Sequence, residues 1–167
     1  TIIPALTAKG YSLTDARDYV VAACWEVIIP GVGMDVPNIG AVSLLKAVEQ
    51  AVANYLHACA TFEDLLALVR EGIAAQAEEI ARDTAMLYME PGPFQSVLMQ
   101  GCLESARDIS TGLRYNNYGI HATGLANAVD ALASVKDLVY DQQTISATAL
   151  QQAMTEGFDQ RPELLAQ

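Results

Sequence analysis

The feature that most constrains the fold is a series of apolar residues at helical spacing. Leucine and valine recur three and four residues apart within residues 41–57, 62–88 and 124–141. This is the pattern of amphipathic helices that each bury one face. Thr61 with Asp64 marks the start of the second helix, and Ser146 caps a further helix over residues 147–156. The sequence therefore predicts a mostly helical domain.

Shorter patterns lie between these helices. Ser12 and Asp15 resemble a capping signal for a helix over residues 13–22. A further helix is predicted over residues 94–107, after the helix-breaking Pro91-Gly92-Pro93. The other expected segments are a buried strand or extended loop at 23–29, a turn-rich stretch at 31–38, a loop with one short strand at 114–118, and a loosely held end from residue 158. We expect an α/β chain in which helices predominate.

The chain has 167 residues and no internal repeat or low-complexity linker, so we expect residues 1–167 to form a single partial domain. It opens at "TIIPAL" without a methionine, and an apolar segment comes before any cap or turn. That opening predicts an internal piece of a longer polypeptide.

Composition restricts the classes of partner. The net charge is −11, and the lysines and arginines are scattered singly, which disfavours a nucleic-acid phosphate backbone. The longest apolar run is broken by Glu26 and Pro30, too early to span a bilayer, so we expect no membrane partner and a cytoplasmic protein. Cys24, Cys59 and Cys102 lack CxxC spacing, and His57 and His121 form no ligand pattern, which predicts reduced thiols and no metal site.

Two Cys-x-Glu triplets are the candidate sites, and their local structure separates them. Residues two apart lie about 200° apart around a helix, whereas on a strand they share a face. Cys102 and Glu104 fall in a predicted helix, so the thiol should face inward and the carboxylate outward. Cys24 and Glu26 fall in the extended run, where both can enter one cavity while Trp25 packs on the opposite side.

A thiol beside a carboxylate suits some chemistry better than others. A nearby negative charge raises a thiol pKa, so Glu26 does not activate Cys24 as a nucleophile, and the sequence offers no convincing His partner for a cysteine hydrolase. A reaction that couples hydrogen-atom abstraction by a thiyl radical to proton transfer to a base would use both Cys24 and Glu26. The alternative is purely structural, with a small buried cysteine and a glutamate paired to a basic group.

Three segments resemble the glycyl radical enzymes of the pyruvate formate-lyase-like superfamily. They are "GYSLTDARDYVVAACWE", "EPGPFQSVLMQGCLESARDIS" and "YNNYGIHATGLANAVDALASVKDLVYDQQTIS", and the likeness covers most of residues 3–157 in the right order. The resemblance implies part of a ten-stranded α/β barrel with the catalytic cysteine on a finger loop. Cys24 matches the cysteine that becomes a thiyl radical, and Glu26 matches the base.

The resemblance also implies partners. No cofactor is expected on these residues, and the glycyl radical would lie outside this chain and be installed by a radical-SAM activating enzyme. A small polar organic substrate, the remainder of the catalytic polypeptide and a homodimeric assembly are expected, in the cytoplasm, with a bacterial microcompartment as one option. These 167 residues contain no R-V-x-G-Y-like radical motif, so the fragment alone should be inactive.

The motif indicates one branch of the family. The pyruvate formate-lyase branch carries two adjacent cysteines and no such Glu, whereas here Ala23 precedes a single Cys24 and Glu26 is present. This favours a lyase or dehydratase that cleaves a C–O, C–N or C–S bond. The alternatives are a pyruvate formate-lyase-type acyltransferase and a non-catalytic acidic helical interaction module.

Overall fold

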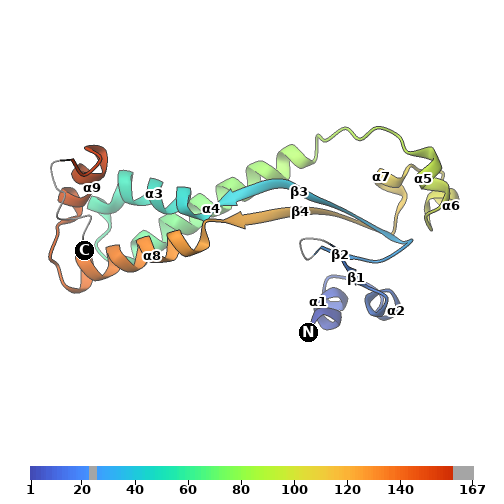
Figure 1. Cartoon of the computed structure of the whole chain (residues 1–167), viewed down its shortest axis with the longest axis horizontal. Coiled ribbons are helices and arrows are strands. Elements are labelled where there is room, and N and C mark those ends of the chain that lie inside the picture. Colours follow the sequence, from blue (N-terminus) through green and yellow to red (C-terminus); the bar gives the residue numbers. More distant parts are fainter. Residues whose placement is uncertain (23–25, 160–167) are drawn as a thin grey trace. The chain divides into compact units, whose positions relative to one another are not determined.

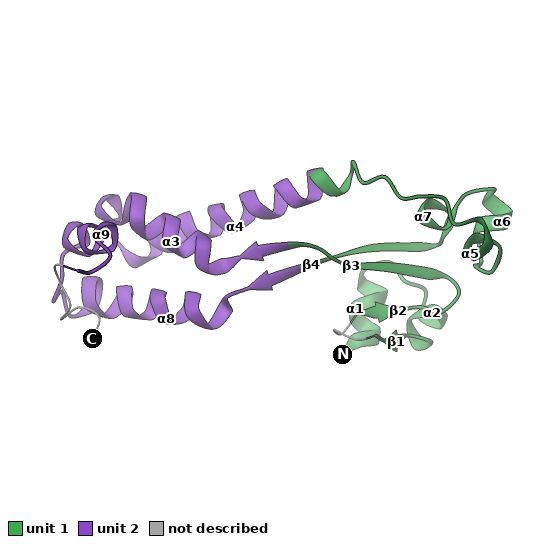
Figure 2. Cartoon of the chain, turned by 45° about the horizontal axis from the view of Figure 1, so that its top comes forward, with its two compact units in different colours: residues 1–40, 83–120 green, residues 41–82, 121–167 purple. Residues whose placement is uncertain are grey.

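The computed structural model describes residues 1–22 and 26–159 (Figure 1). Contacts divide the chain into two compact units, each built from two segments that are distant in sequence (Figure 2). Unit 1 comprises Thr1–Gly40 and Asp83–Ile120, and unit 2 comprises Ala41–Arg82 and His121–Gln167. Most of the described elements are helices, accompanied by two small sheets, which agrees with the expected predominance of helix.

Unit 2 contains the helices that the apolar periodicity predicts. They are α3 (Leu44–Tyr55), η1 (Leu56–Ala58), α4 (Phe62–Thr84), α8 (Leu125–Val135), the π-helical η2 (Lys136–Asp141) and α9 (Ala147–Thr155). Thr61 and Asp64 form the expected reciprocal cap, with backbone-to-side-chain distances of 2.9 and 3.2 Å. The Ser146 hydroxyl accepts from the amide of Ala149 at 3.2 Å, which confirms the second predicted cap.

The boundaries of two of these helices differ from the prediction. Residues 41–43 belong to a strand, and α3 begins after Ser43, whose hydroxyl accepts from the amide of Lys46 at 3.2 Å. The second helix ends at Thr84 rather than Tyr88, and Met86, Leu87 and Tyr88 are exposed. The prediction ran too far because the apolar spacing continues through these three residues, although their side chains are exposed.

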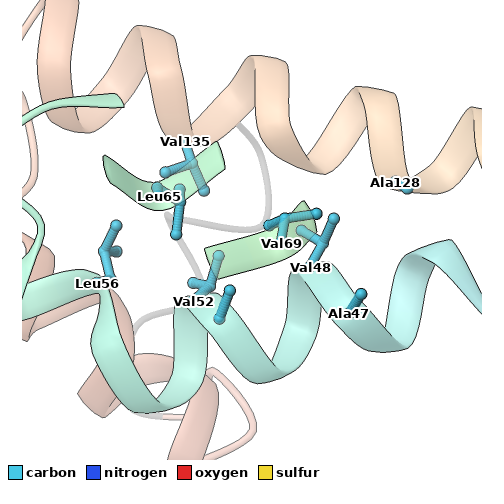
Figure 3. Close-up of a cluster of buried hydrophobic side chains, with 9 residues drawn as sticks. Ala47, Val48, Val52, Leu56, Leu65, Val69, Ala128 and Val135 are labelled. Carbon is cyan, nitrogen blue, oxygen red and sulfur yellow. The ribbon is translucent and has the colours of Figure 1, made fainter. Parts of the chain in front are cut away.

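The core of unit 2 lies between α3, α4 and α8 (Figure 3). Val48, Val52 and Leu56 follow one another at intervals of four residues and so share one helical face. Leu65 and Val69 of α4 meet this face, and both Leu56 and Leu65 have no exposed surface. Burial of this stripe, rather than helix propensity, is the main source of stability for such helices.

Leu65→Ala should lower the free energy of unfolding by about 2–5 kcal/mol, because it removes buried methyl groups and leaves a cavity. Leu125→Ala is the matched control, since 63% of Leu125 is exposed. Urea denaturation followed by circular dichroism measures both. Equal, small effects from the two substitutions would show that Leu65 is not part of a packed core.

Unit 1 contains shorter elements. They are α1 (Ile2–Ala8), α2 (Leu13–Arg17), β1 (Val20–Val21), β2 (Val27–Ile28), β3 (Gly33–Ser43), α5 (Pro93–Val97), α6 (Cys102–Ser105), α7 (Ile109–Gly112) and β4 (Tyr115–Thr123), and both long strands continue a few residues past the boundary of the unit. Strands β1 and β2 are antiparallel, with Val20 opposite Ile28 and Val21 opposite Val27, and β3 pairs with β4. Leu6, Ala16, Ile29 and Val32 form the buried cluster of this unit.

Three predictions for unit 1 were wrong in extent. The helix predicted over 13–22 ends at Arg17, because the β-branched Val20 and Val21 pair with β2 instead. The stretch predicted as turn-rich at 31–38 lies largely in the long strand β3, since the turn is already complete when the amide of Gly33 donates to Ile29 O at 3.0 Å. Its partner β4 is longer than the short strand predicted at 114–118.

The helix predicted over 94–107 was also wrong, because glycine interrupts it. Gly101 has a φ of +97°, and a Cβ there would lie 2.9 Å from the carbonyl oxygen of Gly112. The chain therefore folds as the short helices α5 and α6. Asp108 joins this region to the preceding loop, accepting from the amide of Gly92 at 2.7 Å and from the Ser96 hydroxyl at 3.0 Å.

Candidate functional site

The first Cys-x-Glu triplet lies in the sequence between the antiparallel strands β1 and β2. The amide of Ala22 donates to the carbonyl oxygen of Glu26 at 2.9 Å and so extends the pairing of the two strands by one step. Cys24 and Trp25 lie outside the described residues, so the predicted placement of the thiol and the Glu26 carboxylate in one cavity stays a prediction. Strand β2 confirms extended structure directly after Glu26, within the run predicted as strand or loop.

A second carboxyl group lies close enough to Glu26 to feel its charge. Burial raises the pKa of Asp35, and the negative charge of Glu26 raises it further. Asp35 Oδ1 is buried and accepts no hydrogen bond from any residue that the structure describes. A buried polar atom without a partner is costly and needs a reason. Asp35 therefore holds a proton more readily than an exposed aspartate and belongs with Glu26 in the candidate site.

Sequence reasoning missed Asp35 because residues 31–38 were interpreted as turns, where an aspartate is ordinary. The signal that could have found it is an acidic residue directly between the apolar Met34 and Val36. Glu26 also has apolar neighbours, being half-buried just before the apolar strand Val27–Ile28.

A polar cluster fixes α2 to β4. The rings of Tyr11 and Tyr115 stack with their centroids 4.1 Å apart, and the Tyr115 hydroxyl donates to Asp15 Oδ2 at 2.7 Å. Arg114 Nη1 lies 2.8 Å from the same carboxylate oxygen, and the Ser12 amide donates to the Tyr115 hydroxyl at 3.0 Å. The bonds from Tyr115, Ser12 and Arg114 hold the pKa of Asp15 below its usual range. Ionised Asp15 is thus the centre of this cluster.

The second triplet has the structural role that its spacing predicts. Cys102 is buried, and Glu104 is exposed with its carboxylate accepting from the amide of Gly101 at 2.8 Å. Burial, followed by the charges of Asp108 and Glu104, raises the pKa of the Cys102 thiol. A thiol that stays protonated is a poor nucleophile. The prediction that the thiol faces inward and the carboxylate outward is confirmed.

The remaining cysteine and one histidine show no catalytic arrangement. Cys59 is half-buried, its thiol donates to the Tyr55 carbonyl oxygen at 3.4 Å, and burial raises its pKa. His57 is exposed and its Nδ1 lies 3.1 Å from Gln151 Oε1, as expected for a surface histidine. Residues 1–22 and 26–159 contain no cluster of three or more metal-ligating side chains, and none of their helices is long and apolar enough to cross a bilayer.

Comparison with solved structures identifies the class of proteins that share this fold. The B12-independent glycerol dehydratase of Clostridium butyricum, solved with glycerol bound, matches with a TM-score of 0.81 and 24% identity over 99% of this chain and 23% of its own. A glycyl radical enzyme of Archaeoglobus fulgidus matches with a TM-score of 0.76 and 24% identity over 98% of this chain and 23% of its own. The chain therefore has the fold of a segment of the glycyl radical enzymes.

The family follows from the sequence match. The pyruvate formate lyase-like family model matches residues 1–167, so this chain belongs to that family. The (2S)-3-sulfopropanediol dehydratase of Klebsiella oxytoca is 25% identical over 98% of this chain. The chain spans about 22% of the length of that relative. The resemblance of the three sequence segments to this family is confirmed. The Clostridium butyricum and Klebsiella oxytoca relatives are both dehydratases.

Proposed function

We propose that this chain carries the catalytic cysteine and the catalytic base of a glycyl radical lyase or dehydratase. The observation that carries the proposal is the position of Glu26, whose carbonyl oxygen accepts from the amide of Ala22 and whose charge acts on the half-buried carboxyl group of Asp35. Two carboxyl groups near a thiol raise its pKa rather than generate a thiolate, which suits hydrogen-atom transfer and disfavours nucleophilic attack. The dehydratase names of the relatives support this branch over an acyltransferase.

In the proposed reaction Cys24 acts first and Glu26 acts second. The Cys24 thiol would give its hydrogen atom to a glycyl radical located outside this chain and so become a thiyl radical. The Cys24 thiyl radical then abstracts a hydrogen atom from the hydroxyl-bearing carbon of the substrate. Glu26 accepts the proton of that hydroxyl, and the leaving group on the neighbouring carbon departs with the electron pair of its bond. The product radical recovers a hydrogen atom from Cys24, which leaves a carbonyl compound and the released group. The Cys24 thiyl radical formed in this step would then take its hydrogen atom back from the glycine outside this chain.

The same proposal specifies the surroundings of the site. The residues form part of a larger polypeptide with a ten-stranded α/β barrel, assembled as a homodimer and activated by a radical-SAM enzyme. The substrate is a small polar molecule that loses its leaving group by C–O, C–N or C–S cleavage. The protein works in the cytoplasm, with a bacterial microcompartment as one location, and this segment alone is inactive.

The test is activation of the full-length protein with its radical-SAM partner under anaerobic conditions. Electron paramagnetic resonance should show an organic radical, and incubation with glycerol or (2S)-3-sulfopropanediol as probes of the vicinal-diol class should give a carbonyl product. Pyruvate with coenzyme A is the comparison, because acetyl-CoA formation would identify an acyltransferase. Failure of the activating partner to generate a radical would contradict the proposal and favour an interaction module.

A further inference from the structure

We propose that Tyr115 is a positioning residue that fixes the base of the hairpin carrying Cys24 and Glu26. The proposal rests on the proposed function, because it takes Cys24 and Glu26 as the reacting groups. Tyr115 is more than 80 residues away from both in sequence, at the first position of β4. Its hydroxyl and its ring contact two different segments, one that precedes Cys24 in the sequence and one that follows it.

The hydroxyl contacts the segment that precedes the loop. It accepts from the amide of Ser12 at 3.0 Å and donates to Asp15 Oδ2 at 2.7 Å. Ser12 is the N-cap of α2, and α2 leads into β1 within three residues of its end at Arg17. Arg114, the residue before β4, holds the Asp15 carboxylate at 2.8 Å. The hydroxyl of Tyr115 therefore fixes where β1 begins.

The ring and backbone of Tyr115 contact the segment that follows the loop. Tyr115 packs against the buried cluster that includes Ile29 and Val32, and Val27 of β2 packs against the same cluster. The amide of Tyr115 donates to the carbonyl oxygen of Val32 at 3.3 Å, and a Cβ at Gly33 would lie 3.5 Å from the Tyr115 Cβ. Tyr115 thus holds the segment into which β2 runs.

The hairpin needs such an anchor because it is short. Each strand has two residues, Val20 is 47% exposed and Val21 is 45% exposed. An isolated two-stranded hairpin is marginally stable in water. Its orientation must therefore come from the segments at its base. A displacement of about 1 Å at reacting atoms can cost about 100-fold in rate, so the anchoring of β1 and β2 would govern the rate of the proposed chemistry.

The test compares two phenylalanine substitutions in the activated full-length protein. Tyr115→Phe keeps the stacked ring and removes the hydroxyl that holds α2. Tyr11→Phe is the matched control, because it removes the other hydroxyl of the same stacked pair. That hydroxyl accepts from Asn117 Nδ2 at 2.6 Å and, among the described residues, makes no hydrogen bond to α2. We expect Tyr115→Phe to lower kcat by about 10- to 100-fold with KM unchanged. Tyr11→Phe should lower kcat much less.

A substrate deuterated at the hydrogen-donating carbon separates positioning from loss of folded protein. The isotope effect on kcat should rise in Tyr115→Phe, because a misplaced thiyl radical makes hydrogen transfer more fully rate-limiting. Simple loss of folded enzyme would lower the rate and leave the isotope effect as in the wild type. The amount of glycyl radical per protein should equal that of the wild type. An unchanged kcat, or a lower kcat with an unchanged isotope effect, would overturn the proposal.

Asp15→Asn tests the same bond without altering the ring, and it serves if Tyr115→Phe does not fold. It keeps an oxygen that accepts from Tyr115 but loses the charge, so we expect a smaller fall in kcat with a raised isotope effect. The double variant should be no slower than Tyr115→Phe alone, because coupled residues are not additive. Fully additive losses would overturn the proposal. Retained activity in Cys24→Ser would instead refute the proposed function itself, which keeps the two failures distinct.

Discussion

Replacing Cys24 with serine should abolish turnover while the glycyl radical still forms. A serine hydroxyl holds its hydrogen atom more strongly than a thiol, so a radical on carbon cannot generate the abstracting species at this position. Loss of the group that performs the chemistry typically removes about 10⁴-fold or more of kcat. Electron paramagnetic resonance measures the radical, and product analysis measures turnover in the same sample.

Cys102→Ser is the control for this substitution. Cys102 is buried on α6 and its thiol pKa is raised, so nothing in its position gives it a role in turnover. We expect this variant to be somewhat less stable and fully competent per radical. Substantial activity in Cys24→Ser, or equal losses in the two variants, would exclude Cys24 as the hydrogen-abstracting group.

Replacing Glu26 with glutamine should lower kcat by about 10²- to 10⁴-fold, the range for loss of a general acid or base. The amide has nearly the same shape and cannot accept the substrate proton. The variant should also change its neighbour, because the charge of Glu26 is the second cause of the raised Asp35 pKa. Removing that charge should lower the Asp35 pKa, and burial, the larger cause, should keep it above its usual range.

Asp35→Asn is the matched comparison for Glu26→Gln. It removes the other carboxyl group of the pair and keeps Glu26 as a base, so we expect a smaller fall in kcat. Steady-state rates at several pH values measure both variants. Wild-type turnover in Glu26→Gln would mean that Glu26 has a structural role only.

The helices of unit 2 could be predicted because their signals are local. Val48, Val52 and Leu56 lie at helical spacing, and the Thr61–Asp64 cap uses residues three apart in sequence. Strand β3 could not be predicted in the same way, because it depends on β4 for its hydrogen bonds and the two are more than 70 residues apart. Its Pro37 and Gly40 are residues that single-sequence reasoning assigns to turns.

In the candidate site, too, the features set by neighbouring residues could be predicted and those set by distant contacts could not. Helical geometry assigned Cys102 and Glu104 to opposite sides of the chain, as observed, because only neighbouring residues were involved. Asp35 was missed because its proximity to Glu26 follows from the turn between β2 and β3. The bond between Tyr115 and Asp15 joins residues that are 100 positions apart, which no local pattern reveals.

Hydrogen transfer through Cys24 is the central claim, and isotope tracing in a single turnover of the activated full-length protein tests it most directly. With substrate deuterated at the hydroxyl-bearing carbon, the account predicts a primary isotope effect and product that carries deuterium on the neighbouring carbon, because Cys24 returns the atom it removed. Product that carries no deuterium on the neighbouring carbon, or that forms without an isotope effect, would contradict hydrogen abstraction at this site.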